Sequence, residues 1–331
     1  MHTLKQLAPA AAALLLSACA GTLNVPMDRP MPTSSAFADG KGPKGTLKLV
    51  DARGAEAATF HVGLAGLARF ALATEGLDPV AFLADGLGAE FAARGYPVQV
   101  TADPAAAADM ELKVLRYRIV HRRVNAYSPW EAMHQFRGVL TSGGREFPIL
   151  AYFTNGKVPV WKISEVFEPC VQLPQSILVK EIASKVNRAL LHVRASDAVV
   201  AEIAGRATPK DAQNDGPFME IIELAGTSNP AAMPILKKYV GHKDEFVRIV
   251  ALDAIGILGP EPERAFLQER YAALTDMDKA MALKAIGDIG DEAALAFVTA
   301  QTSDALYAKE AGFSHLVDLY SGKQDAAPQA K

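Results

Sequence analysis

The sequence has 331 residues, of which 50% are hydrophobic, and its formal net charge is −3 at pH 7. This length suffices for two domains with real hydrophobic cores. The near balance of charge argues against a nucleic acid partner. After the N-terminal region, no apolar run is long enough to span a bilayer, so we expect no transmembrane helix.

The first eighteen residues have the features of a secretory signal peptide. Lys5 supplies a positive charge, and residues 7–18 are almost entirely apolar. Such a run is too short to span a bilayer and has the length of a signal-peptide hydrophobic region. It ends with the four residues Leu-Ser-Ala-Cys at 16–19. We therefore predict a signal peptide over residues 1–18.

Residues 16–19 resemble the lipobox of bacterial lipoproteins. The resemblance implies cleavage before Cys19 and attachment of acyl chains to it, three of them in two-membrane bacteria. Each buried methylene contributes about 0.8 kcal/mol, so several chains would hold the protein at the membrane. Ala20 stands where Asp retains enteric lipoproteins at the inner membrane, which favours the periplasmic side of the outer membrane. The alternative is an ordinary signal peptide with a chance cysteine.

The segment after Cys19 is rich in Pro, Ser, Gly, Thr, Asp and Met, and no apolar period appears in it. We predict a lipidated flexible tether over residues 19–44, with a reach of roughly 25–30 Å by coil statistics. The only other cysteine is Cys170. With Cys19 acylated, we expect a buried, inert thiol there. Without acylation, a disulfide between the two cysteines is the alternative.

Residues 45–195 are predicted to form an α+β domain. Alternating apolar patterns indicate strands at 46–51, 96–101, 110–124, 135–142 and 146–154. Helical spacing indicates helices at 79–94 and 174–193. The order predicts an antiparallel sheet with helices on one face. Behind a lipobox, this element order resembles the envelope lipoproteins of the ABC-transport auxiliary type.

The strand predicted at 110–124 carries a row of arginines. Alternation places Arg116, Arg118 and Arg122 on the face opposite Tyr117 and Ile119. Guanidinium groups at this spacing can grip phosphate or carboxylate, so anionic lipid, lipopolysaccharide or cell-wall glycan is a candidate ligand. The alternative is a solvent-facing strand whose charges keep it soluble.

After a linker predicted at residues 196–216, the chain is helical and repeats. Residues 251–259, ALDAIGILG, recur at 282–290 as ALKAIGDIG, an offset of 31 residues. The pattern resembles short bacterial HEAT repeats, which implies a small all-α solenoid over residues 217–322 and leaves 323–331 as a disordered tail. A generic Ala-rich helical bundle is the alternative.

Such a solenoid presents a curved face on which a protein partner can bind. We expect five charged positions to be exposed there: Glu245, Arg248, Asp253, Lys279 and Lys284. Arg248 can instead be structural, bonding to the turn of a neighbouring repeat.

The sequence lacks the motifs of common enzyme classes. It contains no phosphate-binding loop, no nucleophile elbow and no zinc-protease helix. Its histidines are scattered, so we predict no metal and no cofactor. The function expected is a membrane-anchored periplasmic lipoprotein, not an enzyme, that binds or scaffolds an envelope protein assembly. A binding module for anionic lipid or glycan is the alternative, and a cryptic hydrolase is the least favoured.

Overall fold

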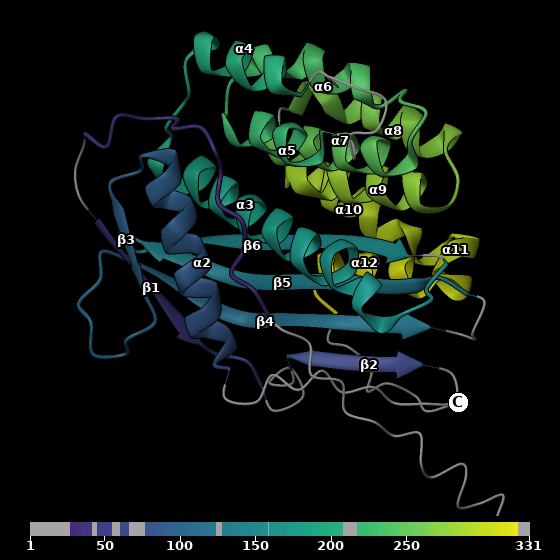
Figure 1. The fold of residues 1–331 in the computed structure, drawn as a ribbon, viewed down its shortest axis with the longest axis horizontal. Coiled ribbons are helices and arrows are strands. Elements are labelled where there is room, and N and C mark those ends of the chain that lie inside the picture. The colour runs from purple at the N-terminus through teal and green to yellow at the C-terminus, as the bar shows by residue number, and fades with distance from the viewer. Residues whose placement is uncertain are drawn as a thin grey trace, which may run out of the picture.

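The computed structural model describes residues 27–41, 45–54, 60–65, 77–123, 128–157, 159–207, 217–259 and 261–323. The predicted signal peptide, Cys19 and most of the predicted tail lie outside the described residues. The fold is α+β, with a mixed sheet followed by a largely helical C-terminal region (Figure 1). None of the helices described has the length and apolar character needed to cross a membrane.

The sheet combines parallel and antiparallel pairs. Its strands are β1 (Gly45–Asp51), β2 (His61–Ala65), β3 (Val98–Thr101), β4 (Met110–Arg123), β5 (Trp130–Ser142) and β6 (Arg145–Lys157). They follow the order β3-β1-β4-β5-β6, with β2 beside β4. β4, β5 and β6 pair antiparallel, as expected. β1 runs parallel to β3 and β4, and β2 runs parallel to β4, so the sheet is mixed and the expected antiparallel arrangement holds only for part of it. Helix α2 (Pro79–Arg94) supplies the crossover that parallel pairing requires.

Local sequence signals account for the ends of several elements. The side chain of Asp78 caps the N-terminus of α2, and Gly95 ends the helix in the left-handed conformation. β5 and β6 meet in a hairpin whose turn residues Gly143 and Gly144 both have positive φ. Helix and hairpin lie where the sequence predicts them.

Short helical turns surround a central helix and lead into the C-terminal region. Around α3 (Leu173–Val186) lie η1 (Ile163–Val166), η2 (Glu168–Gln172) and η3 (Asn187–Leu191). The helices that follow are α4 (Asp197–Arg206), α5 (Phe218–Gly226), α6 (Met233–Tyr239), α7 (Glu245–Leu258), α8 (Arg264–Ala273), α9 (Asp276–Ile289), α10 (Glu292–Ala300), α11 (Ala305–Lys309) and α12 (Ala311–Ser321). Three 3₁₀ turns join them: η4 (Pro230–Ala232), η5 (Glu261–Glu263) and η6 (Gln301–Ser303). Part of the expected linker is thus helix α4, capped by the Ser196 hydroxyl.

Helices cover both faces of the sheet. α3 lies against the face that carries His134, whose Nδ1 is 3.1 Å from Gln175 Oε1 of that helix. Tyr152 points to the opposite face because successive strand residues alternate, and its hydroxyl donates to the Gly312 carbonyl of α12 at 2.9 Å. The two helices predicted for the α+β domain, α2 and α3, lie on one face of the sheet, as expected (Figure 1). The opposite face is covered by α12 of the helical region, which was not expected there. The last helix folds back over β5 and β6.

Residues 27–41, which we call the N-terminal strap, lie across the helices rather than forming the flexible tether expected there (Figure 1). Thr33 donates through its backbone N–H to Glu90 Oε2 of α2 at 2.8 Å. Ser34 donates to Glu223 Oε1 of α5 at 2.9 Å, and Phe37 is buried. The polar composition that indicated a tether instead provides hydroxyl and amide groups for two buried carboxylates.

Candidate functional site

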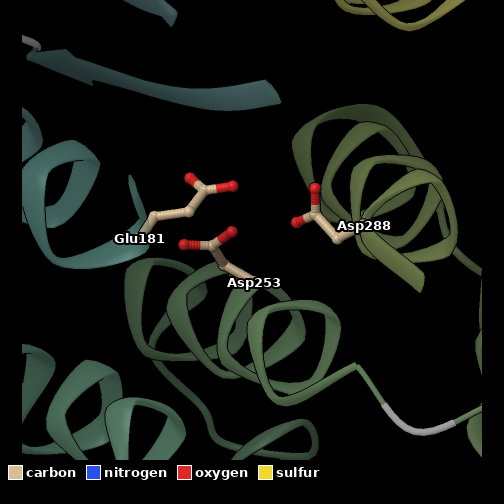
Figure 2. Close-up of side chains that lie close together, drawn as sticks. All are labelled: Glu181, Asp253 and Asp288. Carbon is tan, nitrogen blue, oxygen red and sulfur yellow. The ribbon is translucent and has the colours of Figure 1, made fainter. Parts of the chain in front are cut away.

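Five charged side chains meet where the sheet domain contacts the helical region. Glu181 and Lys185 come from α3, Asp253 comes from α7, and Lys284 and Asp288 come from α9. We call this group the junction cluster. None of its members is more than 5% exposed. Figure 2 shows that the three carboxyl groups point toward one another from these three helices.

The ammonium group of Lys284 lies at the centre of the junction cluster. Its Nζ is 2.6 Å from Glu181 Oε1 and 2.6 Å from Asp288 Oδ2, and it also contacts Asp253 Oδ1. Lys185 Nζ pairs with Glu181 Oε1 at 2.6 Å and with Asp288 Oδ1 at 2.5 Å. Both lysines therefore join helices that are about a hundred residues apart in the chain.

Groups from two further elements close the junction cluster. The Tyr320 hydroxyl of α12 donates to Asp288 Oδ1. Arg188 Nη2 of η3 donates to the Asp288 backbone carbonyl at 2.8 Å. Asp288 thus connects α9 with α3, η3 and α12. Through its five residues and these two groups, the junction cluster links α3, η3, α7, α9 and α12.

The junction cluster holds three carboxyl groups and two ammonium groups, so one carboxyl group lacks a matching charge. Burial raises the pKa of Asp253 to about 8, although Lys284 opposes the rise. Burial also raises the pKa of Glu181. The two lysines outweigh burial at Asp288 and lower its pKa. At neutral pH the Asp253 carboxyl group therefore holds a proton, which leaves two ammonium groups facing two carboxylates.

Three carboxylates in this arrangement could ligate a hard cation. One oxygen from each of Glu181, Asp253 and Asp288 lies within 4.8 Å of the others. The Lys284 ammonium group touches all three residues and so supplies the positive charge from the chain itself. The geometry therefore supports a structural lock between helices.

Two of the residues predicted to form a partner surface lie in the junction cluster. Asp253 and Lys284 occupy the same position of the 31-residue repeat, and both are 0% exposed. Their expected exposure is wrong because α7 and α9 present this position to α3, which carries Glu181 and Lys185.

The other predicted partner residues lie nearer the surface. Arg248 donates to Asp278 Oδ2 of the next repeat at 2.8 Å and to the His242 carbonyl at 3.1 Å, so its structural interpretation holds. Lys279, one repeat later, pairs with Asp304 at 2.8 Å. Glu245 is exposed. The ion pairs Arg248–Asp278 and Lys279–Asp304 therefore join neighbouring segments of the helical region.

The arginine row lies on the face opposite Tyr117, as predicted, but that face is largely covered. Arg116 is 7% exposed and its Nη2 is 3.5 Å from the Lys323 carbonyl, which follows α12. Arg118 is 8% exposed and donates to Gln135 Oε1 at 3.0 Å. Arg122 is half-buried opposite Glu131 of β5. The exposed row that an anionic ligand requires is not formed by Arg116 and Arg118.

A second buried network lies on the other side of α3. Glu90 pairs with Arg94 of its own helix at 2.6 Å and with Lys180 of α3 at 3.1 Å. Burial opposes ionisation of Glu90, but these two cations and Thr33 of the strap lower its pKa to about 2. This network joins α2, α3 and the N-terminal strap.

Two histidines that are scattered in the sequence are in contact in the structure. His61 Nε2 of β2 lies 2.5 Å from His121 Nδ1 of β4, because these parallel strands place the two residues in neighbouring positions. Burial lowers the pKa of His61 to about 3. Cys170 is buried nearby, as expected, and burial raises the pKa of its thiol to about 12. These are neutral core groups at neutral pH.

Comparison with known proteins adds no assignment. No family model matches the chain, and no curated protein matches it. One similar solved structure is described only as "Crystal structure of uncharacterized protein". It has 10% sequence identity and a TM-score of 0.27, and the match covers 49% of this chain and 99% of that one. A TM-score this low carries no argument about fold or function.

The charge of Lys284 is predicted to hold the junction together. In Lys284→Met, one ammonium group would face three buried carboxyl groups, and the loss of one partner from a buried ion network typically costs about 3–5 kcal/mol. Urea unfolding measures the loss. Lys279→Met in the same helix is the control, since its partly exposed ion pair contributes about 1 kcal/mol or less. Equal losses in the two variants would contradict the lock.

The proton on Asp253 predicts a pH dependence of stability. Its pKa is about 8 in the folded protein against 3.8 in the unfolded chain, so between these values the folded state binds the extra proton. The free energy of unfolding should therefore fall as pH rises from 5 to 8, by up to about 1.4 kcal/mol per pH unit for one group. Asp253→Asn, which keeps the neutral form, should flatten this slope. Parallel slopes of wild type and variant in urea unfolding would disprove the assignment.

Proposed function

We propose that the chain is a bacterial envelope lipoprotein, anchored through acyl chains on Cys19, whose folded part is a non-enzymatic binding or scaffolding module. The observation that carries the anchor is the Leu-Ser-Ala-Cys sequence at residues 16–19, which follows an apolar run of signal-peptide length. The residue after the cysteine is Ala20, which favours the periplasmic side of the outer membrane.

The helical region is proposed to be a short HEAT-like array. Close helix approaches support this interpretation, because Gly256 of α7 faces Ala285 of α9 and the equivalent Gly287 faces Tyr320 of α12, with no space for a side chain at either glycine. Arg248 and Lys279 occupy equivalent positions of the 31-residue repeat, and each pairs with an aspartate that lies later in the chain. Such arrays bind protein partners along an extended surface.

The surface available to a partner lies on the far side of the array. The face made by α7 and α9 is occupied by the chain's own α3, through the junction cluster. Helices α4, α6 and α8 lie away from the sheet (Figure 1), and we call them the outer helices. Lys238 of α6 and Glu269 of α8 are exposed there. We assign the partner to this outer surface.

Acylation at Cys19 is the first expectation to test. In a two-membrane bacterium, the wild type should fractionate with the membrane and carry acyl mass on its N-terminal cysteine. Cys19→Ala should be soluble or uncleaved, because it removes the thiol that carries the lipid. Cys170→Ala is the matched control and should remain acylated, since it leaves Cys19 and the residues before it unchanged. A wild type without acyl mass would refute the anchor.

Partner binding is tested by charge reversal on the outer helices. Removal of the helical region would leave Glu181 and Lys185 of α3 without their partners in α9 and could unfold the protein. Substitutions on the surface avoid this effect. The double variant Lys238→Glu with Glu269→Lys should lose the envelope proteins that copurify with the wild type after crosslinking. Arg145→Glu with Glu146→Lys, at the exposed β5–β6 hairpin, is the control and should retain them. Identical copurifying proteins in all three would exclude the outer helices as the surface.

A further inference from the structure

Among the described residues, the large hydrophobic side chains that are exposed belong to Met31, at 40%, and Trp161, at 82%. Both lie near the end of the molecule where α3 begins. The Met31 backbone N–H donates to the Ser176 hydroxyl, in the first turn of α3, at 2.9 Å. Trp161 lies just before η1, in the segment that leads into α3. In the part of the chain that the structure describes, exposure of large apolar side chains is therefore confined to this end.

The backbone of the loop that carries Trp161 is held in place by contacts with the folded part. The Trp161 backbone N–H donates to Glu165 Oε2 at 3.0 Å. Its neighbour Val160 packs against the small buried cluster that contains Trp130 and Cys170. The backbone is fixed while the indole points away from the core. The fold therefore presents this side chain outward instead of covering it.

The chain enters the fold beside the same loop. Gln172 of η2 donates through its side-chain amide to the Arg29 carbonyl at 3.0 Å. Cys170 of η2 lies in the cluster against which Val160 packs, so η2 joins the entering chain to the loop. Arg29 lies ten positions after Cys19 in the chain, and even a fully extended segment of that length spans at most about 35 Å. An acyl anchor at Cys19 therefore keeps this end near the membrane.

We propose that the loop carrying Trp161 inserts its indole into the lipid interface of the membrane to which Cys19 is anchored. This inference rests on the proposed anchor. An indole combines a large apolar surface with one N–H donor, and tryptophan is accordingly enriched at the interfaces of bilayers. The charge of the exposed Lys162 beside it is offset by Glu165 and Glu168 of the same segment, so the indole and not charge carries the contact. The occupant of this surface is therefore a phospholipid bilayer.

The two tryptophans of the chain provide the test. Trp130 is only 3% exposed, so Trp130→Phe leaves Trp161 as the fluorescent reporter, and Trp161→Phe leaves Trp130. Each full-length, acylated variant is placed in vesicles of phosphatidylethanolamine and phosphatidylglycerol, with or without brominated acyl chains. Bromine quenches only those indoles that reach the acyl chains. We expect the Trp161 reporter to shift to shorter wavelength and lose most of its emission, while the Trp130 reporter is unchanged.

The outcomes separate this inference from the anchor. If the acylated protein binds vesicles and the Trp161 reporter is neither shifted nor quenched, the loop faces water or a protein and the inference is overturned, while the anchor stands. If the purified wild type carries no acyl chain and stays off the vesicles, the anchor fails and the inference fails with it. Should Trp130→Phe not fold, the difference in quenching between wild type and Trp161→Phe gives the same measurement.

Discussion

Enclosure of α3 is the constraint on which the rest of the structure depends. Lys180, Glu181 and Lys185 of this helix are at most 5% exposed. A buried charge costs several kcal/mol unless a partner compensates it, so each of the three requires a group from another element. α2 supplies Glu90 for Lys180 on one side, and α9 supplies Lys284 for Glu181 and Asp288 for Lys185 on the other. Sheet domain and helical region are thereby joined by paired charges.

The same constraint explains why the helical array turns one face inward. A repeat helix needs small residues where it approaches its neighbour, and Gly256 and Gly287 meet that need. The position three residues before each glycine then points to α3, where Asp253 and Lys284 have opposite sign and contact each other. The face that α7 and α9 form at this position is therefore occupied by α3 of the same chain.

The N-terminal strap is also held by hydrogen bonds to buried charged groups. Because Thr33 and Ser34 satisfy the carboxylates of Glu90 and Glu223, the segment after the proposed anchor is bound to the folded part. If the residues soon after an anchor are bound to the folded part, the anchor fixes which end of the molecule faces the lipid. A long flexible tether would leave that orientation free. The exposed Trp161 lies at that end. With the proposed anchor at Cys19, the strap and the Trp161 loop would define the orientation of the protein at the membrane.

The sequence by itself determined what depends on neighbouring residues. Helical spacing of apolar residues predicted α2, and apolar alternation predicted the strands β5 and β6. The 31-residue offset placed Asp253 and Lys284 at equivalent positions. The tertiary structure alone decided where those charges point. A lysine within an apolar helix pattern predicts an exposed face unless a counter-charge is known, and Glu181, which pairs with Lys284, is 103 residues away. Parallel pairing, the course of α12 and the binding of the strap likewise depend on contacts between distant segments, which no local pattern encodes.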